Sequence, residues 1–247
     1  MQWTDAAFVL AARRHGESAL VVELLTREYG RHLGLVRGGQ SPKRRAVLQP
    51  GNEVRAVWRG RLPEHLGMLE CELVRAHAAG LLDDPPRLAA LAAAAALLAA
   101  TLGEREPQAE IFAGFARLLA ALDSGGGWPA HYVAWECELL AGLGFGLDLR
   151  SCAATGAATD LTHVSPRTGR AVSRAAAAPY RDKLLALPEF LWRDTQADGR
   201  AIVDGLSLTG HFLLHQVLMP QGCGLPEARR RFAALMERAA AVGMIGA

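Results

Sequence analysis

The sequence predicts an α+β protein in which a small β-barrel is followed by an α-helical domain. In the first 80 residues, short apolar or alternating runs are separated by turn residues. After residue 80, leucine and aromatic residues recur at helical spacing. The stretch 149–179 is small and polar with little periodicity, which predicts an irregular insert in the helical part. We therefore expect one domain over 1–80 and a second over 81–247, in a chain long enough to bury a sizeable core.

Five runs in the first domain have the pattern of β-strands. In the fourth run, Val54, Ala56 and Trp58 share one face by a period of two, while Arg55 and Arg59 share the other. Closing a sheet removes its exposed edges, so five closely spaced strands predict a closed barrel. The count matches an OB-fold, although an SH3-like barrel has a similar pattern. The expected strands are 6–14, 18–26, 30–36, 53–60 and 66–75.

Six helices are expected in the second domain. Asp84 followed by two prolines is typical of a helix start, and glycines such as Gly103 and Gly144 mark helix ends. The most apolar stretch, 88–102, is shorter than the roughly 20 residues of a membrane span. No secretory signal is recognised near the start, so we expect a cytoplasmic protein without a membrane partner. The expected helices are 87–102, 107–122, 129–143, 184–195, 202–218 and 226–242.

Charge is balanced over the whole chain but uneven along it. Lys and Arg number 27 and Asp and Glu 25, which excludes a strongly basic chromatin-type protein. Between residues 13 and 61, however, 11 basic residues stand against 4 acidic ones. Such a local excess attracts polyanions whatever the net charge.

The basic excess centres on Lys43, Arg44 and Arg45. We expect a flexible loop here, between the third and fourth strands, that wraps a phosphate backbone and orders on contact. Tyr29 is a candidate for stacking on bases, whereas Trp58 is expected in the core because it lies on the apolar face of its strand. An ordinary solvated face is the alternative interpretation. The candidate nucleic-acid contacts are Arg13, Arg14, Arg31, Arg37, Lys43, Arg44, Arg45, Arg55, Arg59 and Arg61.

Motifs of covalent catalysis are missing from the sequence. It contains no Walker loop, no G-x-G-x-x-G, no G-x-S-x-G and no H-E-x-x-H. His211 and His215 have the i, i+4 spacing of a helical metal pair, but no neighbouring carboxylate convincingly completes a site. A hydrolase that uses a histidine of the helical domain is a rival for which no nucleophile–base pair can be named. The sequence therefore favours a binding protein over an enzyme.

One stretch near the middle of the chain resembles a degenerate zinc knuckle. Cys152 is present, but Thr155 replaces the second cysteine, and Ser173 and Ala176 replace the other two. These side chains cannot hold Zn²⁺, which needs thiolate or imidazole donors, and His163 adds only one more ligand. The remaining cysteines are scattered, so no disulfide framework is expected. We expect no cofactor and a metal-free loop held by hydrogen bonds and packing.

Several segments, taken together, resemble the RecO family of DNA repair and recombination proteins. The resemblance covers essentially the whole chain and rests on the order and spacing of the segments. The region around Cys152 is similar to that of members that have lost zinc. The segments are 7–10, 16–18, 24–30, 36–39, 48–52, 144–149 and 164–173.

The resemblance implies an N-terminal OB-fold, a helical C-terminal domain and no enzymatic turnover. It implies a nucleoid-associated mediator that binds single- and double-stranded DNA and anneals complementary strands. RecO proteins work with RecR, and sometimes RecF, to load RecA onto DNA coated by single-stranded-DNA-binding protein (SSB). They also contact the acidic C-terminal tail of SSB, which requires a cation and an apolar pocket. Candidate residues for that tail are Phe112, Phe115, Arg117, Tyr132 and Arg150.

An RNA-binding OB-fold protein of translation or tRNA handling is the alternative. Phosphate contacts carry no base information, so the basic residues alone do not distinguish DNA from RNA.

Overall fold

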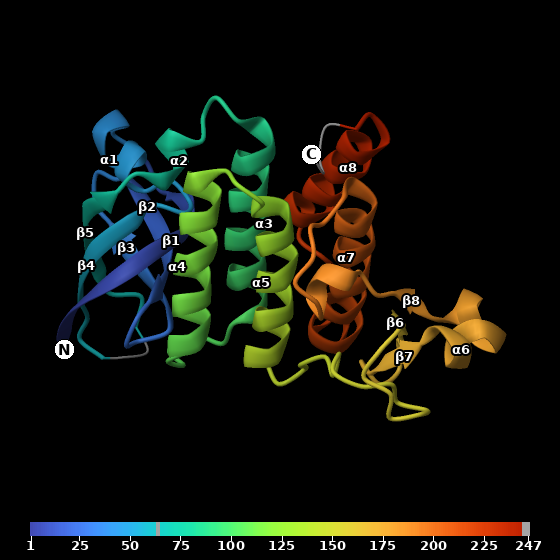
Figure 1. The fold of residues 1–247 in the computed structure, drawn as a ribbon. Coiled ribbons are helices and arrows are strands. Elements are labelled where there is room, and N and C mark those ends of the chain that lie inside the picture. The colour runs from blue at the N-terminus through green and yellow to red at the C-terminus, as the bar shows by residue number, and fades with distance from the viewer. Residues whose placement is uncertain (63–64, 244–247) are drawn as a thin grey trace. The chain divides into compact units, whose positions relative to one another are not determined.

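The computed structural model describes residues 1–62 and 65–243 (Figure 1). The chain forms two compact units, Met1–Asp123 and Ser124–Ala247. The first unit contains the N-terminal strands together with two of the long helices that the sequence analysis assigned to a second domain. No helix in the described ranges is long and apolar enough to span a membrane.

The first unit contains a closed five-stranded barrel, which confirms the α+β prediction. The strands follow one another around the ring in the order β1-β2-β3-β5-β4. β3 and β5 are parallel and pair where Leu35 lies opposite Met68, whereas the other neighbours are antiparallel. The strands are β1 (Gln2–His15), β2 (Ala19–Thr26), β3 (Arg31–Val36), β4 (Glu53–Arg59) and β5 (Met68–Arg75).

Apolar side chains from every strand fill the barrel interior. Trp58 is 1% exposed, and its indole Nε1 donates a hydrogen bond to the backbone oxygen of Leu66 at 3.2 Å. Gly67, at φ 59°, lies so close to the ring that an added Cβ would come within 2.4 Å of it. The predicted placement of Trp58 in the core is therefore confirmed.

Three helices follow the barrel within the first unit. They are α2 (His77–Gly80), α3 (Pro85–Thr101) and α4 (Ala109–Ser124). Asp84 caps α3 by accepting a hydrogen bond from the backbone N–H of Arg87 at 3.1 Å. Phe112 and Phe115 of α4 pack on Phe8 of β1, with ring centroids 4.9 and 5.2 Å apart. These rings join α4 to the outside of the barrel.

A buried ion pair connects the three long helices of the second unit. Arg229 donates from Nε and Nη2 to the two carboxylate oxygens of Glu136, at 2.5 and 2.9 Å. The hydroxyl of Thr209 donates to the same carboxylate at 2.5 Å. Burial of both charges is tolerated because each satisfies the other. The helices are α5 (Trp128–Gly142), α7 (Gly199–Phe212), which continues as a π-helical turn η3 (Leu213–Leu218), and α8 (Glu227–Ala241).

The segment between α5 and α7 forms a small sheet with irregular connections. Its three strands pair in the order β7-β6-β8. A short helix and a 3-10 turn connect β7 to β8. The elements are β6 (Leu161–Val164), β7 (Ala171–Ser173), α6 (Arg174–Ala177), η1 (Ala178–Lys183) and β8 (Leu185–Ala186). We call residues 148–187, which include this sheet, the insert.

The helix predicted at 184–195 is wrong. Its first residues form β8, and the backbone N–H of Leu187 donates to the oxygen of Thr162 at 2.9 Å. Pro188 then follows, and a proline inside a helix would remove one hydrogen bond and clash with the preceding turn. The chain forms only the 3-10 turn η2 (Glu189–Leu191) at this point.

Replacing Trp58 by Ala is expected to lower the free energy of unfolding of the barrel by about 3–5 kcal/mol, because it removes a large buried ring. Trp58→Phe should cost less, since most of the apolar volume remains. Denaturant unfolding followed by circular dichroism measures both. Equal stability of Trp58→Ala and the unaltered chain would contradict the core assignment.

Candidate nucleic-acid interface

Lys43, Arg44 and Arg45 lie on a short helix, α1 (Pro42–Val47), between β3 and β4. The loop predicted for these residues is therefore wrong. A proline occupies the first helical turn, where its fixed φ favours the helix. At the other end, the side-chain amide of Asn52 donates to the backbone oxygens of the last two helical residues, at 2.9 and 3.1 Å. The three cations are thus presented from an ordered element.

A groove of about 610 Å³ borders α1. Lys43 and Arg44 of α1 and Arg55 of β4 line it. Glu70 and Glu72 of β5 line it as well, and Arg55 forms an ion pair with Glu72 at 3.8 Å. The groove is therefore cationic along α1 and mixed in charge along the two strands.

The thiol of Cys71 also lines this groove. Burial raises its pKa to about 12, and the opposing effect of the nearby Arg44 is smaller. Cys71 is therefore uncharged at neutral pH, and the charge of the groove comes from its basic and acidic side chains alone.

A second hollow of about 290 Å³ also borders α1. Arg45 of α1 and Arg14 of β1 line it, together with Gln40. The side-chain amide of Gln40 donates to the backbone oxygens of Gly16 and Ala19 at 3.0 and 3.1 Å, which fixes the turn before α1 to the β1–β2 hairpin. The two hollows together place cations from three separate segments around one short helix.

Most of these cations have no acidic partner. Seven of the ten predicted contacts are exposed and form no ion pair with any residue in 1–62 or 65–243; they are Arg13, Arg14, Arg37, Lys43, Arg44, Arg45 and Arg61. We define the α1 basic surface as the cations that line the two hollows, namely Arg14, Lys43, Arg44, Arg45 and Arg55. Arg55 pairs with Glu72, but the other four have no acidic partner among the described residues, and their charge is available to an anionic partner.

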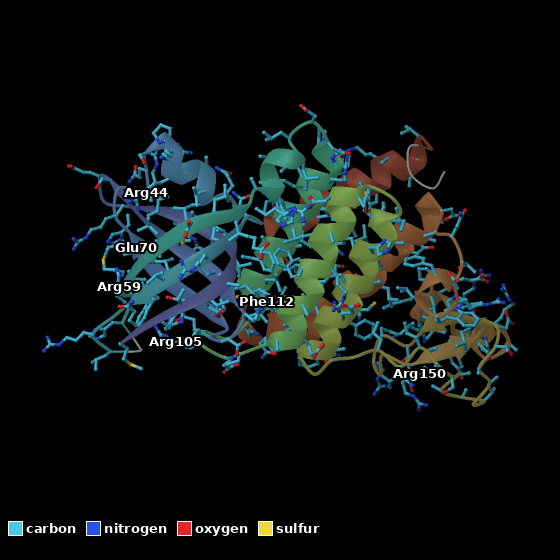
Figure 2. The ribbon with its side chains drawn as sticks, turned by 60° about the vertical axis from the view of Figure 1, so that its left-hand side comes forward. Arg44, Arg59, Glu70, Arg105, Phe112 and Arg150 are labelled. Carbon is cyan, nitrogen blue, oxygen red and sulfur yellow. The ribbon has the colours of Figure 1, made fainter. Side chains whose placement is uncertain are left out.

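The other predicted contacts are not gathered at α1. Arg31 is largely buried and pairs with Glu23 and, at 3.9 Å, with Glu104. Arg59 pairs with Glu70 at 2.8 Å (Figure 2). Arg61 is exposed in the connection after β4. The predicted ten-residue set is thus divided between a free cluster and side chains that are already paired or lie elsewhere. Sequence reasoning missed Glu70 and Glu72. The signal that could have revealed them is the antiparallel pairing of β4 and β5, which brings these acidic residues beside the face of β4 that carries Arg55 and Arg59.

Tyr29 lies on an aromatic stack that the sequence analysis did not recognise. Its ring stacks on Trp3 at 4.7 Å with an angle of 11° between the planes, and Trp3 in turn stacks on Trp58 at 6.0 Å. His32 packs edge-on against both tryptophans, and burial, followed by the charge of Arg105, lowers the pKa of His32 to about 4. Tyr29 is 40% exposed, so one end of the stack reaches solvent.

The candidates for an SSB-tail site fall in both compact units. Phe112, Phe115 and Tyr132 are buried, and the ring of Tyr132 packs against the interior of the second unit. Arg117 and Arg150 are exposed (Figure 2 labels Arg150). The exposed part of this set therefore consists of its two cations.

The segment around Cys152, which the sequence analysis likened to a degenerate zinc knuckle, contains hydrogen bonds to one sulfur. The backbone N–H of Ser173 donates to Sγ of Cys152 at 3.2 Å, and the Cys152 side chain is buried. Burial raises the pKa of this thiol, but hydrogen bonds from Ser173, Thr155 and the backbone outweigh that effect and lower it to about 6. One thiol and two hydroxyls do not fit a zinc ion. Within the described residues no group of three or more His, Cys, Asp or Glu side chains could hold a metal.

Comparison with known proteins identifies the family. Residues 1–77 match the family described as Recombination protein O N terminal, and residues 82–222 match Recombination protein O C terminal. The DNA repair protein RecO of Rhodospirillum rubrum is 51% identical over 245 residues, which cover 96% of this chain and 97% of the relative. That of Rhodospirillum centenum is 54% identical over 234 residues, which cover 94% and 93%. The chain belongs to the RecO family.

RecO membership confirms the resemblance inferred from the sequence. The N-terminal family match contains the barrel and the α1 basic surface, and the C-terminal match contains the insert. The two matches meet near residue 80, whereas the compact units divide after Asp123. Both divisions therefore separate the barrel from α5, α7 and α8. They differ over α3 and α4, which fall in the C-terminal family match but belong to the same compact unit as the barrel.

The lowered pKa of Cys152 predicts a pH-dependent stability. The folded state holds the thiolate, so its contribution is complete above the ordinary pKa of 9.0 and is lost as the pH falls through about 6. The free energy of unfolding should therefore decrease between pH 9 and pH 6, and Cys152→Ser should show a smaller decrease because serine does not titrate. Chemical denaturation at each pH measures this, with Cys223→Ser, at an exposed cysteine of the same unit, as the control. If the free energy of unfolding changes equally with pH in Cys152→Ser and in the unaltered chain, the folded state does not hold Cys152 as a thiolate.

Proposed function

We propose that this RecO-family chain is a recombination mediator in DNA repair. It binds single- and double-stranded DNA, anneals complementary strands and, with RecR, helps to load RecA onto single-stranded DNA coated by SSB. The observation that carries the proposal is the α1 basic surface, where Arg14, Lys43, Arg44 and Arg45 are exposed and without an acidic partner among the described residues. Membership in a family of DNA repair and recombination proteins makes DNA the natural polyanion for this surface.

The proposed activity follows from charge. Two DNA strands repel each other, and a cationic surface lowers that repulsion while the bases of the strands pair with one another. Each phosphate contact releases counterions, so the logarithm of the affinity falls with the logarithm of the salt concentration by about 0.7 per contact on a single strand. Phosphate contacts carry no sequence information, which suits a protein that anneals any complementary pair.

The proposed activity requires no covalent chemistry and no cofactor. The donors around Cys152 do not suit zinc, and hydrogen bonds from Ser173 and Thr155 supply the cohesion that a metal would give. The protein would therefore act as a binding protein and not as an enzyme.

The remaining partners follow from the family. We propose RecR as a direct partner, RecF as an additional one in some circumstances, and RecA as an indirect one, within the cytoplasm and at the nucleoid. The acidic tail of SSB is the proposed ligand of the helical part, with Arg117 and Arg150, which are both exposed, as the candidate contacts for its carboxylates.

The triple variant Lys43→Ala, Arg44→Ala, Arg45→Ala tests the α1 basic surface. Binding to a single-stranded oligonucleotide should weaken, and the log–log salt slope should become shallower by about 2, because three phosphate contacts are lost. Fluorescence anisotropy across a salt series measures both quantities.

A matched control removes three other exposed arginines that are paired with carboxylates, Arg200, Arg230 and Arg231. It changes the net charge equally and should leave the affinity and the slope nearly unaltered. If the α1 variant and the control bind alike, the proposed interface is wrong.

Arg117→Glu tests the proposed SSB-tail contact. Affinity for a peptide with the acidic tail should fall by about tenfold, because a charge-assisted contact becomes a repulsion. Titration of the full chain with a labelled peptide measures this, and Arg13→Glu, which makes the same charge change on the barrel, is the control. Unaltered affinity of Arg117→Glu would remove this residue from the site.

A further inference from the structure

The insert of the second unit carries an excess of positive charge. Between residues 148 and 183 it has six basic and three acidic side chains, which are Arg150, Arg167, Arg170, Arg174, Arg181 and Lys183 against Asp148, Asp160 and Asp182. All six basic residues are exposed. An excess of this size in so short a segment contrasts with the near-balance of the whole chain.

Two of the six cations are paired, and four are not. Arg170 binds Asp148 at 3.3 Å, and Arg174 binds Asp160 at 3.1 Å, both in largely exposed pairs that solvent screens. The other four form no ion pair with any residue of the described ranges; they are Arg150, Arg167, Arg181 and Lys183. Most of the positive charge of the insert is therefore available to a partner.

The cations of α6 and η1 lie in one continuous stretch of chain directly after β7. Arg174 and Arg181 are both near enough to His163 of β6 for their charges to lower its pKa, after the larger effect of burial. Lys183 ends the same turn, and its acidic neighbour is Asp182. These three cations stand against two carboxylates, Asp160 and Asp182, so the segment keeps a small excess of positive charge.

An aromatic ring accompanies these charges. Tyr180 lies in η1, directly before Arg181, and is 61% exposed. An exposed ring beside cations is the combination with which proteins bind single strands, since a base stacks on the ring while the cations contact phosphates. Figure 1 shows α6 at the outer end of the insert, away from α7 and α8, where a long polymer has access.

We propose that Arg174, Tyr180, Arg181 and Lys183, which we call the α6–η1 surface, form a second nucleic-acid-binding surface that holds the second strand during annealing. This inference rests on the proposed function, because annealing requires two strands. A strand bound at the α1 basic surface neutralises the cations there and repels the next strand. Cations on a separate surface that the first strand does not contact keep their charge, so they can bind the second strand.

Co-occupancy of two strands tests this inference on the full chain. One single-stranded oligonucleotide carries a donor dye, and a second, non-complementary one carries an acceptor; energy transfer reports both on one protein. The variant Arg174→Ala, Arg181→Ala, Lys183→Ala should retain first-strand affinity within about twofold, lose energy transfer and anneal complementary strands about tenfold more slowly, since it removes the free cations Arg181 and Lys183 together with Arg174, whose exposed pair with Asp160 is screened by solvent.

Two further variants separate charge from folding. Arg174→Lys, Arg181→Lys keeps the positive charge and should retain co-occupancy. The control that removes Arg200, Arg230 and Arg231 takes three cations from the same unit and should also retain it.

Tyr180→Ala should weaken second-strand binding by about tenfold, because one base loses its stacking partner.

Three outcomes would overturn the inference. The alanine triple variant could show unaltered energy transfer; it could lose first-strand affinity as fully as the Lys43, Arg44, Arg45 variant; or it could lose only the binding of an acidic peptide. If the unaltered chain bound no strand at all, the proposed function itself would fail, which is a distinct result.

Discussion

The double pairing of β1 determines the shape of the N-terminal unit. The first half of this long strand pairs with β4, from Gln2 opposite Arg59 to Phe8 opposite Glu53, and the second half pairs with β2 as far as His15 opposite Ala19. This double pairing of β1, together with the parallel pairing of β3 and β5, closes the ring. A closed barrel has an apolar interior, so the alternate side chains, including the arginines, must face outward. The positions of the basic residues depend on this closure.

Whether an outward arginine is free depends on what lies opposite it. On the β4–β5 face, Glu72 and Glu70 stand against Arg55 and Arg59, and the charges largely cancel. Around α1 no carboxylate of the described residues forms an ion pair with the cations of the helix, although Glu70 and Glu72 line the same groove. Only some of the many arginines between residues 13 and 61 therefore belong to a surface of unpaired cations. In the insert, likewise, Arg170 is paired with Asp148, whereas Arg181 forms no ion pair with the described residues.

The barrel and Trp58 could be predicted from the sequence because both follow from a period of two over whole strands. The short elements could not. Helix α1 has six residues, too few to show a helical period, and it depends on the side chain of Asn52 beyond its own end. β8 has two residues and exists only through its pairing with β6. Ion pairs such as Arg59–Glu70 depend on the register between strands, which composition does not reveal. The family was recognised correctly because the order of many segments survives such local uncertainty, and it favours recombination over the translation alternative.

The central claim is that α1 presents nucleic acid with an ordered, unneutralised cationic surface. Amide hydrogen exchange of the full chain, with and without a saturating single-stranded oligonucleotide, tests it most directly. The account predicts slower exchange in residues 41–49, which contain α1 and its C-terminal turn, and little change along β4 and β5. Protection confined to β4 and β5, with α1 unaffected, would contradict it.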